Sequence, residues 1–350
     1  MMRATAFPLF PEQASTMAAQ VDHLYIFLIV VSLVFSIGIA VTLIGFAVKF
    51  RRTPENQVGH PIHGSNLLEI AWSVLPFGLT MVIFAWGAWL FFGFSRPPDN
   101  AHEVFVVGKQ WMWKLQHMEG RREINELHVP IGQPVKLTMT SEDVIHSFYV
   151  PAFRVKFDVL PGRYTTAWFE PTKAGEYHMF CAEYCGTEHS RMIGKVVVME
   201  PADYQAWLAE QPPVIAAAGS VVAAPAAAAA AGVSPVGAGE ALFTAKACVT
   251  CHQPQGGALG PSLVGVYGKP VQLADGTSTT INDDYLRESI LNPTAKIVAG
   301  FQPVMPTFQG QLSEEQIMQL IQYIKSLTAG APAPGQGMAQ GQPGAADRPS

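Results

Sequence analysis

The chain has 350 residues, of which 49% are hydrophobic and only 14% are charged. Typical soluble proteins carry about 25% charged residues, so we expect part of this chain to lie in lipid and the whole to form more than one domain. The formal net charge of −5 provides no basic surface of the kind that nucleic-acid binding requires, which excludes that class of partner.

Two long uncharged runs account for much of the low charge. Residues 24–48 and residues 70–94 each hold 25 positions without a charged side chain, more than the ~20 needed to cross a bilayer as a helix. A cleaved signal peptide is the alternative for the first run, but the run exceeds the usual ~7–15 apolar residues and no small-residue cleavage site follows it. A buried soluble helix is the alternative for the second. We expect an N-terminal segment at 1–23 and two transmembrane helices within 24–95.

The loop between these runs predicts their orientation. Lys49, Arg51 and Arg52 follow the first run directly, whereas Arg3 is the only Lys or Arg before it. Because basic loops stay in the cytoplasm, both long ends of the chain are expected outside. Everything after about residue 95 is then expected on the outer face of the membrane.

From residue 96 to residue 210 the pattern changes to short β-rich runs separated by glycine and proline. Many short strands with closely spaced turns favour a sandwich or barrel, and helix has little support here. We expect an all-β domain built from the runs EVFVVGKQWMW, QPVKLTMTS, HSFYVPAF, YTTAWFEP, GEYHMF and GKVVVME.

Two stretches are rich in alanine, proline and glycine. Residues 211–239 are expected to form a linker; a third membrane span is the alternative, because residues 213–233 carry no charge. Pro225 interrupts that stretch and alanine contributes little apolar area, which favours the linker. Residues 329–350 have the composition of a disordered tail.

Between the linker and the tail, residues 240–328 show helical patterns. The run at 313–327 begins with Ser313 as a candidate N-cap and has Gln316 three positions later, followed by apolar residues on one face. A second short helix is predicted at 283–293. We expect a small all-α domain.

The run CAEYCGTEHSRM, residues 181–192, concentrates soft metal ligands. The thiols of Cys181 and Cys185, with His189 and Met192, are a set that selects copper or zinc. A structural zinc site with one more histidine and a disulfide outside the membrane are both alternatives. Neither explains Met192, and a mononuclear blue-copper site needs only one cysteine.

The same run resembles the C-x-E-x-C-G-x-x-H-x-x-M signature of subunit II of cytochrome c oxidase. The resemblance implies a cupredoxin-like sandwich with a binuclear copper site called copper A, in which two bridging thiolates spread one electron over both metals. SEDVIHSFYVP matches the family context of the remaining histidine. The implied copper ligands are His146, Cys181, Cys185, His189, Met192 and the backbone carbonyl of Glu183.

Other matches to this family imply further roles. VGKQWMW makes Trp111 the expected point where electrons enter, with a core tryptophan as the alternative. Asp143 is expected to orient part of the copper shell, and Glu183 to offer its carboxylate to a magnesium ion at the interface with subunit I. KFDVLPGR implies that Asp158 and Arg163 face that subunit.

Glu69, in LLEIAW, directly precedes the second apolar run. It lies at the cytoplasmic start of the second apolar run, where the family resemblance implies that it helps protons enter the large subunit. A glutamate that merely reaches the membrane interface is the alternative.

The second cysteine pair, in CVTCH, is the attachment signature of c-type heme. Cys248 and Cys251 would form thioethers and His252 would ligate the iron; a thioredoxin-like motif would not need that histidine. GFQPVMPTF and GPSLVGVYGK resemble class I cytochromes c, which implies Met305 as the second axial ligand and the Pro261 carbonyl as partner of the His252 ring. Heme is attached outside the cytoplasm, so a third membrane span would leave this domain on the wrong side.

Together the resemblances imply subunit II of a bacterial caa-type cytochrome c oxidase, with two transmembrane helices, a copper A domain and a cytochrome c domain. The implied partners are subunit I and further oxidase subunits, membrane lipid, and a cytochrome c or another small redox protein as donor. The implied location is the bacterial inner membrane, with the copper and heme domains on the periplasmic side. A copper A subunit of a nitric oxide reductase is the alternative. A quinol oxidase subunit would lack the copper ligands, and a zinc-binding structural module is a rival from a different class.

Overall fold

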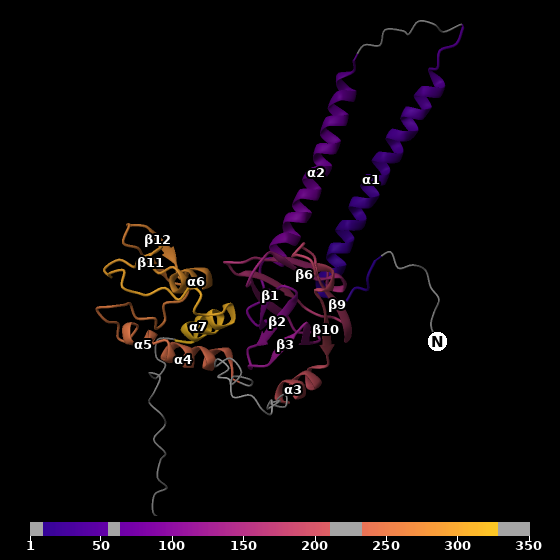
Figure 1. Cartoon of the computed structure of the whole chain (residues 1–350). Helices are drawn as coiled ribbons and strands as arrows, with labels where there is room; N and C mark the ends of the chain where they lie inside the picture. The colour runs from indigo at the N-terminus through magenta and orange to yellow at the C-terminus, as the bar shows by residue number, and fades with distance from the viewer. Residues whose placement is uncertain (1–9, 55–63, 211–232, 328–350) are drawn as a thin grey trace, which may run out of the picture. The chain divides into compact units, whose positions relative to one another are not determined.

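The computed structural model describes residues 10–54, 64–210 and 233–327 (Figure 1). The chain divides into two compact units, Met1–Ser220 and Val221–Ser350. Of the expected linker at 211–239, residues 211–232 lie outside the described residues. The expected tail at 329–350 lies wholly outside them.

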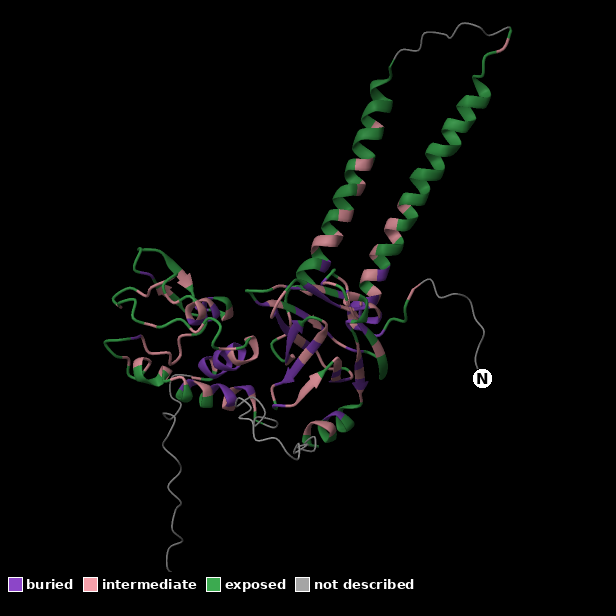
Figure 2. Cartoon of the chain, viewed as in Figure 1, coloured by how far each residue is buried: buried purple, intermediate pink, exposed green. Residues whose placement is uncertain are grey.

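The first unit begins with two long helices, α1 (Thr16–Lys49) and α2 (Asn66–Phe94). Both are long and apolar enough to cross a membrane, and most of their residues are exposed in the isolated chain (Figure 2). α1 begins eight residues before the expected start at 24, because Ser15 caps it by accepting a hydrogen bond from the Ala18 N–H. At ~1.5 Å per residue its 34 residues span about 51 Å, more than the ~30 Å hydrocarbon core, so part of α1 stands outside the lipid.

A sandwich of two five-stranded sheets follows. In the first sheet the order is β3-β2-β1-β5-β8 and in the second it is β4-β10-β9-β6-β7. Most neighbouring strands are antiparallel, but β1 pairs with β5 and β4 with β10 in parallel. The strand bounds are β1 His102–Lys109, β2 Met112–His117, β3 Arg122–Ile124, β4 Glu126–Pro130, β5 Val135–Ser141, β6 His146–Val150, β7 Val155–Val159, β8 Thr165–Phe169, β9 Gly175–Cys181 and β10 Ile193–Met199.

Alternating side chains of both sheets fill one apolar core. Its largest fully buried members include Trp113, Phe148, Phe153 and Phe169. Two short 3₁₀ turns, η1 (Pro151–Phe153) and η2 (His189–Arg191), interrupt the loops, and helix α3 (Pro201–Ala209) follows the last strand. This sandwich carries the cysteine-rich run.

The second unit is a small helical domain, with α4 (Pro235–Ala245), α5 (Cys248–Cys251), α6 (Asp283–Leu291) and α7 (Glu314–Ser326). The predicted capping box of Ser313 and Gln316 is present at the start of α7, and α6 lies within the second predicted helix. α4 begins five residues before the expected domain start at 240, because Ser234 caps it. A two-stranded sheet, β11 (Pro270–Gln272) with β12 (Ser278–Thr280), is the exception to all-α structure.

α4 and α7 cross in direct contact. A methyl group on Gly239 would lie 2.0 Å from the carbonyl oxygen of Gln319, so only glycine allows this approach. Phe243 packs beside the crossing on Tyr323, with ring centroids 5.2 Å apart. The predicted fold class of two apolar helices, a β-sandwich and a small helical domain is confirmed.

Candidate functional site

The candidate metal ligands converge at one end of the sandwich. His146 is the first residue of β6 and Cys181 is the last residue of β9, and these two strands are neighbours. The loop after β9 carries Cys185 and His189, and Met192 closes η2 immediately before β10. The end of β9 and the loop after it therefore lie next to a histidine that is 35 residues upstream of Cys181.

Distances within this group are short. The Sγ atoms of Cys181 and Cys185 lie 3.8 Å apart, and His146 Nδ1 lies 3.8 Å from the first sulfur. His189 Nδ1 is 3.4 Å and Met192 Sδ is 3.8 Å from the second sulfur. His146, Cys181 and Cys185 form the one group of three His, Cys, Asp or Glu residues in the described part of the chain with all ligand atoms within 4.8 Å.

The pKa values of the two thiols are shifted in opposite directions. Burial alone raises the pKa of Cys181, but hydrogen bonds with His146 and with backbone groups outweigh it and lower the pKa to about 6. Burial and the charge of Cys181 raise the pKa of Cys185 to about 12. Because two thiolates this close repel each other, ionisation of Cys181 disfavours ionisation of Cys185, and a bound cation would favour the thiolate form of both.

Asp143 holds the ring of His146 from behind. His146 Nε2 lies 2.8 Å from Asp143 Oδ1, so Nε2 carries the proton and Nδ1 faces the sulfur of Cys181. Burial lowers the pKa of His146, but the hydrogen bonds with Cys181 and Asp143 raise it above its ordinary value. A carboxylate behind a histidine is the usual device that orients a metal-binding imidazole.

Two neighbours from the β1–β2 turn clamp the cysteine loop. The side-chain amide of Gln110 donates to the carbonyl of Cys185 at 2.8 Å, and the Trp111 indole N–H donates to the same oxygen at 3.3 Å. The backbone N–H of Gln110 donates to Asp143 at 2.8 Å. Sequence reasoning missed Gln110, because its partner lies 75 residues away and no local pattern announces such a contact.

The donor set fits copper better than a disulfide or a structural zinc site. The structure has both cysteines free, with sulfurs at nearly twice the ~2.05 Å of a disulfide. The fully buried thioether of Met192 and the carbonyl of Glu183, 3.2 Å from Cys181 Sγ, are not donors of structural zinc sites. Soft sulfur with imidazole suits copper.

The remaining predicted residues of this unit lie at the surface. The Glu183 side chain is exposed, and Arg163 is exposed too. Asp158 pairs with Lys156 at 3.1 Å and is half-exposed. Glu69 lies exposed in the first turn of α2.

The second cysteine pair lies on a single helical turn in the other unit. α5 carries Cys248 and Cys251 on its first and last residues, and His252 follows. His252 Nδ1 lies 2.9 Å from the Pro261 carbonyl, so Nδ1 donates and Nε2 is left free as a ligand. Gly260 makes room for this arrangement, since a methyl group there would lie 3.1 Å from the Cys251 carbonyl and 3.2 Å from the His252 ring.

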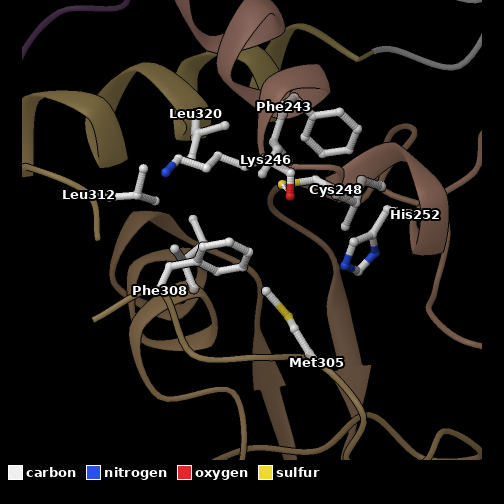
Figure 3. Close-up of a pocket in the computed structure, with 11 residues that line it drawn as sticks. Phe243, Lys246, Cys248, His252, Met305, Phe308, Leu312 and Leu320 are labelled. Atoms are coloured by element: carbon white, nitrogen blue, oxygen red, sulfur yellow. Dashed lines mark hydrogen bonds between the residues drawn. The ribbon is translucent and has the colours of Figure 1, made fainter. Parts of the chain in front are cut away.

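A cavity of about 450 Å³ opens beside this turn. Its lining includes Cys248, Cys251, His252 and Met305, together with apolar side chains of α6 and α7. Figure 3 shows a smaller pocket that shares part of this lining, with the His252 ring, the Met305 side chain and the sulfur of Cys248 at its wall. An apolar cavity with two thiols, an imidazole and a thioether fits a covalently attached heme. Lys246 also lines it, which the sequence pattern did not single out.

Three regions of the chain match known families. Residues 4–88 match the family described as cytochrome c oxidase subunit II, transmembrane domain, and residues 121–200 match its periplasmic domain. Residues 234–324 match the family described as cytochrome c oxidase, cbb3-type, subunit III. These matches follow the two apolar helices, the sandwich and the helical unit.

Individual relatives agree with these matches. Cytochrome c oxidase subunit 2 of Alkalihalophilus pseudofirmus is 29% identical over 87% of this chain and 86% of that protein. Alternative cytochrome c oxidase subunit 2 of Bradyrhizobium diazoefficiens is 37% identical over 34% of this chain, which spans about half (54%) of that protein. The crystal structure of the periplasmic domain of subunit II of cytochrome oxidase of Bradyrhizobium japonicum is 29% identical, covers 33% of this chain and 95% of that one, and has a TM-score of 0.32.

Proposed function

Because this chain belongs to the subunit II family of cytochrome c oxidase and carries a fused cytochrome c domain, we propose that it delivers electrons to the oxygen-reducing subunit I. The chain would accept them from a cytochrome c or a similar small redox protein at its heme-binding domain. It would pass them through the copper-binding end of the sandwich to heme in subunit I, with proton pumping coupled to that reaction.

The residues proposed to hold two copper ions are those that converge after β9. Cys181 and Cys185 would bridge the ions, His146 and His189 would each bind one, and the thioether of Met192 and the Glu183 carbonyl would complete the shell. When bound, the pair supplies one-electron transfer with little change in geometry. The chain contributes a constrained ligand position: His146 is fully buried, and Asp143 sets the direction of its ring.

The residues proposed to hold heme c surround the cavity of the second unit. Cys248 and Cys251 would form thioethers, with His252 and Met305 as axial ligands. His252 is already in the required tautomer, because the Pro261 carbonyl accepts its Nδ1–H. Histidine with methionine raises the potential of bound heme iron, as suits an acceptor late in a respiratory chain.

Trp111 is the residue proposed to receive electrons at the surface of the copper domain. Its indole is half-buried and packs against the core of the sandwich. Its N–H donates to the carbonyl of Cys185, so one hydrogen bond connects the surface ring to a proposed copper ligand. With a heme domain on the same chain, the effective concentration of that donor can reach the millimolar range.

The proposed contacts with the rest of the oxidase follow from exposed charges. Glu69, at the start of α2, would help protons enter subunit I, and Asp158 with Arg163 would face that subunit. The exposed carboxylate of Glu183 would be available to a magnesium ion at the interface.

The chain is membrane-anchored by two transmembrane helices, with its subunit II domain periplasmic. We extend this to a bacterial inner membrane with the heme domain on the same, periplasmic side. Attachment of heme to Cys248 and Cys251 outside the cytoplasm supports that side.

The close approach of two free, buried thiols to two imidazoles and one thioether supports this proposal most strongly. The test is metal and heme analysis of the purified full chain. We expect two copper ions per chain and one heme that stays attached under denaturing conditions. Zinc in place of copper, or no covalent heme, would contradict the proposal.

A further inference from the structure

A buried ion pair attaches the outer end of α1 to the sandwich. Arg154 Nε donates to Asp22 Oδ1 and Arg154 Nη2 donates to Asp22 Oδ2, both at 2.8 Å. The two side chains are only 10% and 8% exposed. Two parallel hydrogen bonds fix the orientation of the guanidinium relative to the carboxylate as well as the distance between them, whereas a single hydrogen bond does not fix the orientation.

The guanidinium of Arg154 also donates hydrogen bonds to backbone carbonyls of separate segments. It donates to the carbonyls of Pro11 at 2.9 Å, Glu12 at 3.4 Å and Pro151 at 2.7 Å. Arg154 itself has φ +56°, a left-handed conformation that disfavours residues other than glycine. An arginine is therefore held in a strained backbone position where its side chain joins the N-terminal segment, α1 and the turn after β6.

Backbone pairing and the second helix reinforce this junction. The Ala14 N–H donates to Ala152 at 3.0 Å, and Ser15 Oγ donates to the carbonyl of Phe153 at 2.9 Å. From α2, the carbonyl of Gly93 accepts the indole N–H of Trp168 on β8 at 2.9 Å. Both helices are thus fixed to the sandwich at their outer ends.

Strand β6 connects this junction to the copper-binding end. His146 is its first residue, and η1 and Arg154 follow its last residue, Val150. Five residues span roughly 17 Å, so one short strand holds a proposed ligand at a set distance from the junction, and a displacement of α1 would move the copper-binding end as a whole relative to the membrane. Functional geometry is held best by such rigid elements.

We propose that Asp22 and Arg154 are positioning residues that set the distance between the copper-binding end of the sandwich and the electron acceptor in the membrane. This inference rests on the proposed function. Electron tunnelling falls exponentially with distance, so a looser junction slows transfer out of the sandwich while the ligand cage stays intact. No role in binding copper is assigned to either residue.

The test uses the complete oxidase complex with Asp22→Asn and, separately, Arg154→Lys. Asparagine keeps the size of the side chain but removes its charge, and lysine keeps the charge but loses the paired donors. After rapid photoreduction of the copper site, we expect transfer to the heme of subunit I to slow several-fold and to become multiphasic. The paramagnetic resonance spectrum of the copper and the rate of its reduction should not change.

Lys173→Ala is the matched control. Lys173 pairs with Glu12 at 2.9 Å across the same junction, but the two side chains are 53% and 60% exposed. Exposed pairs of this kind contribute little, so this variant should transfer electrons at the unmodified rate. Unmodified transfer in both Asp22→Asn and Arg154→Lys, or slowing equal to that of the control, would overturn the positioning role.

A second measurement serves if a variant does not assemble with the other subunits. In the copper-loaded chain alone, a nitroxide on Val30→Cys, an exposed position of α1, reports its distance to the copper spin. The distance distribution should broaden in Asp22→Asn and Arg154→Lys; an unchanged distribution overturns the inference. Absence of copper in the unmodified chain would instead be a failure of the proposed function.

Discussion

His146 presents one ring nitrogen to Asp143 and the other to Cys181. Nε2 donates to the carboxylate at 2.8 Å, and Nδ1 lies 3.8 Å from the sulfur. The tautomer is therefore fixed by a residue that does not itself belong to the candidate ligand set.

Asp143→Ala should weaken copper binding by about 10–100-fold, as is usual when the partner behind a ligating histidine is removed. Competition with a copper chelator in the full chain measures this. Glu176→Ala is the control, because its carboxylate makes only an exposed ion pair with Lys195. Equal affinity in the two variants would contradict a role for Asp143 in orienting His146.

Met192→Leu should change the reduction potential of the copper site while the fold is kept. The Met192 side chain is fully buried with its sulfur 3.8 Å from Cys185 Sγ, and leucine replaces its volume at a cost of less than about 1.5 kcal/mol. Redox titration of the full chain measures the potential. Met179→Leu, equally buried in the same core, should leave it unchanged; identical potentials in both would remove Met192 from the ligand set.

Gly239→Ala should destabilise the heme-binding domain by about 1–3 kcal/mol, as overpacking does. Its methyl group would meet the Gln319 carbonyl at 2.0 Å, where backbone must move. Thermal unfolding followed by heme absorbance is the measurement. Gly237→Ala on the same helix, where the nearest atom is a side-chain methyl of Val233 at 3.1 Å, should be close to neutral.

Acid should weaken the sandwich through Glu123. This carboxylate is buried, which by itself raises its pKa, but hydrogen bonds with His117 and His128 lower the pKa below 4.5. The pKa of Glu123 is lower in the folded chain than in the unfolded chain. Its contribution to the free energy of unfolding is therefore complete above pH 4.5 and is lost as the pH falls through the folded pKa.

Denaturant midpoints at decreasing pH test this expectation. The unmodified chain should lose stability below pH 4.5 more steeply than Glu123→Gln does. Glu126→Gln, at an exposed ion pair, should follow the unmodified chain. A Glu123→Gln variant with an unchanged pH dependence would contradict the argument.

Glu69→Ala should slow oxygen turnover in the complete oxidase while the copper and heme spectra stay as in the unmodified chain. The residue lies in the first turn of α2, whereas the last turn of α2 contacts the sandwich through Gly93. Normal turnover would leave Glu69 as a glutamate that only reaches the membrane interface.

Much of the fold could be predicted from local patterns in the sequence. The capping box at Ser313, the two uncharged runs and the β-rich runs are each visible within a few residues of sequence, and each corresponds to an element of the structure. α1 begins eight residues before the uncharged run, because its first two turns mix polar with apolar residues and pack on the sandwich instead of lipid. Hydropathy reports only the part of a helix that lies in lipid.

Contacts between distant segments could not be anticipated. Asp22 and Arg154 are separated by 132 residues, and Gln110 and Cys185 by 75. The flanking sequence of neither Arg154 nor Gln110 distinguishes it from a surface residue. The cysteine run was recognisable because four of the proposed side-chain ligands lie within twelve positions and match a family signature, whereas the residues that orient them come from segments distant in the sequence.

Electron paramagnetic resonance on the oxidised, copper-loaded full chain tests the central claim most directly. The arrangement of Cys181 and Cys185, with an imidazole beside each sulfur, predicts a single unpaired electron shared equally by two copper nuclei. A spin confined to one copper nucleus, or no copper signal in material that contains two copper ions per chain, would contradict it.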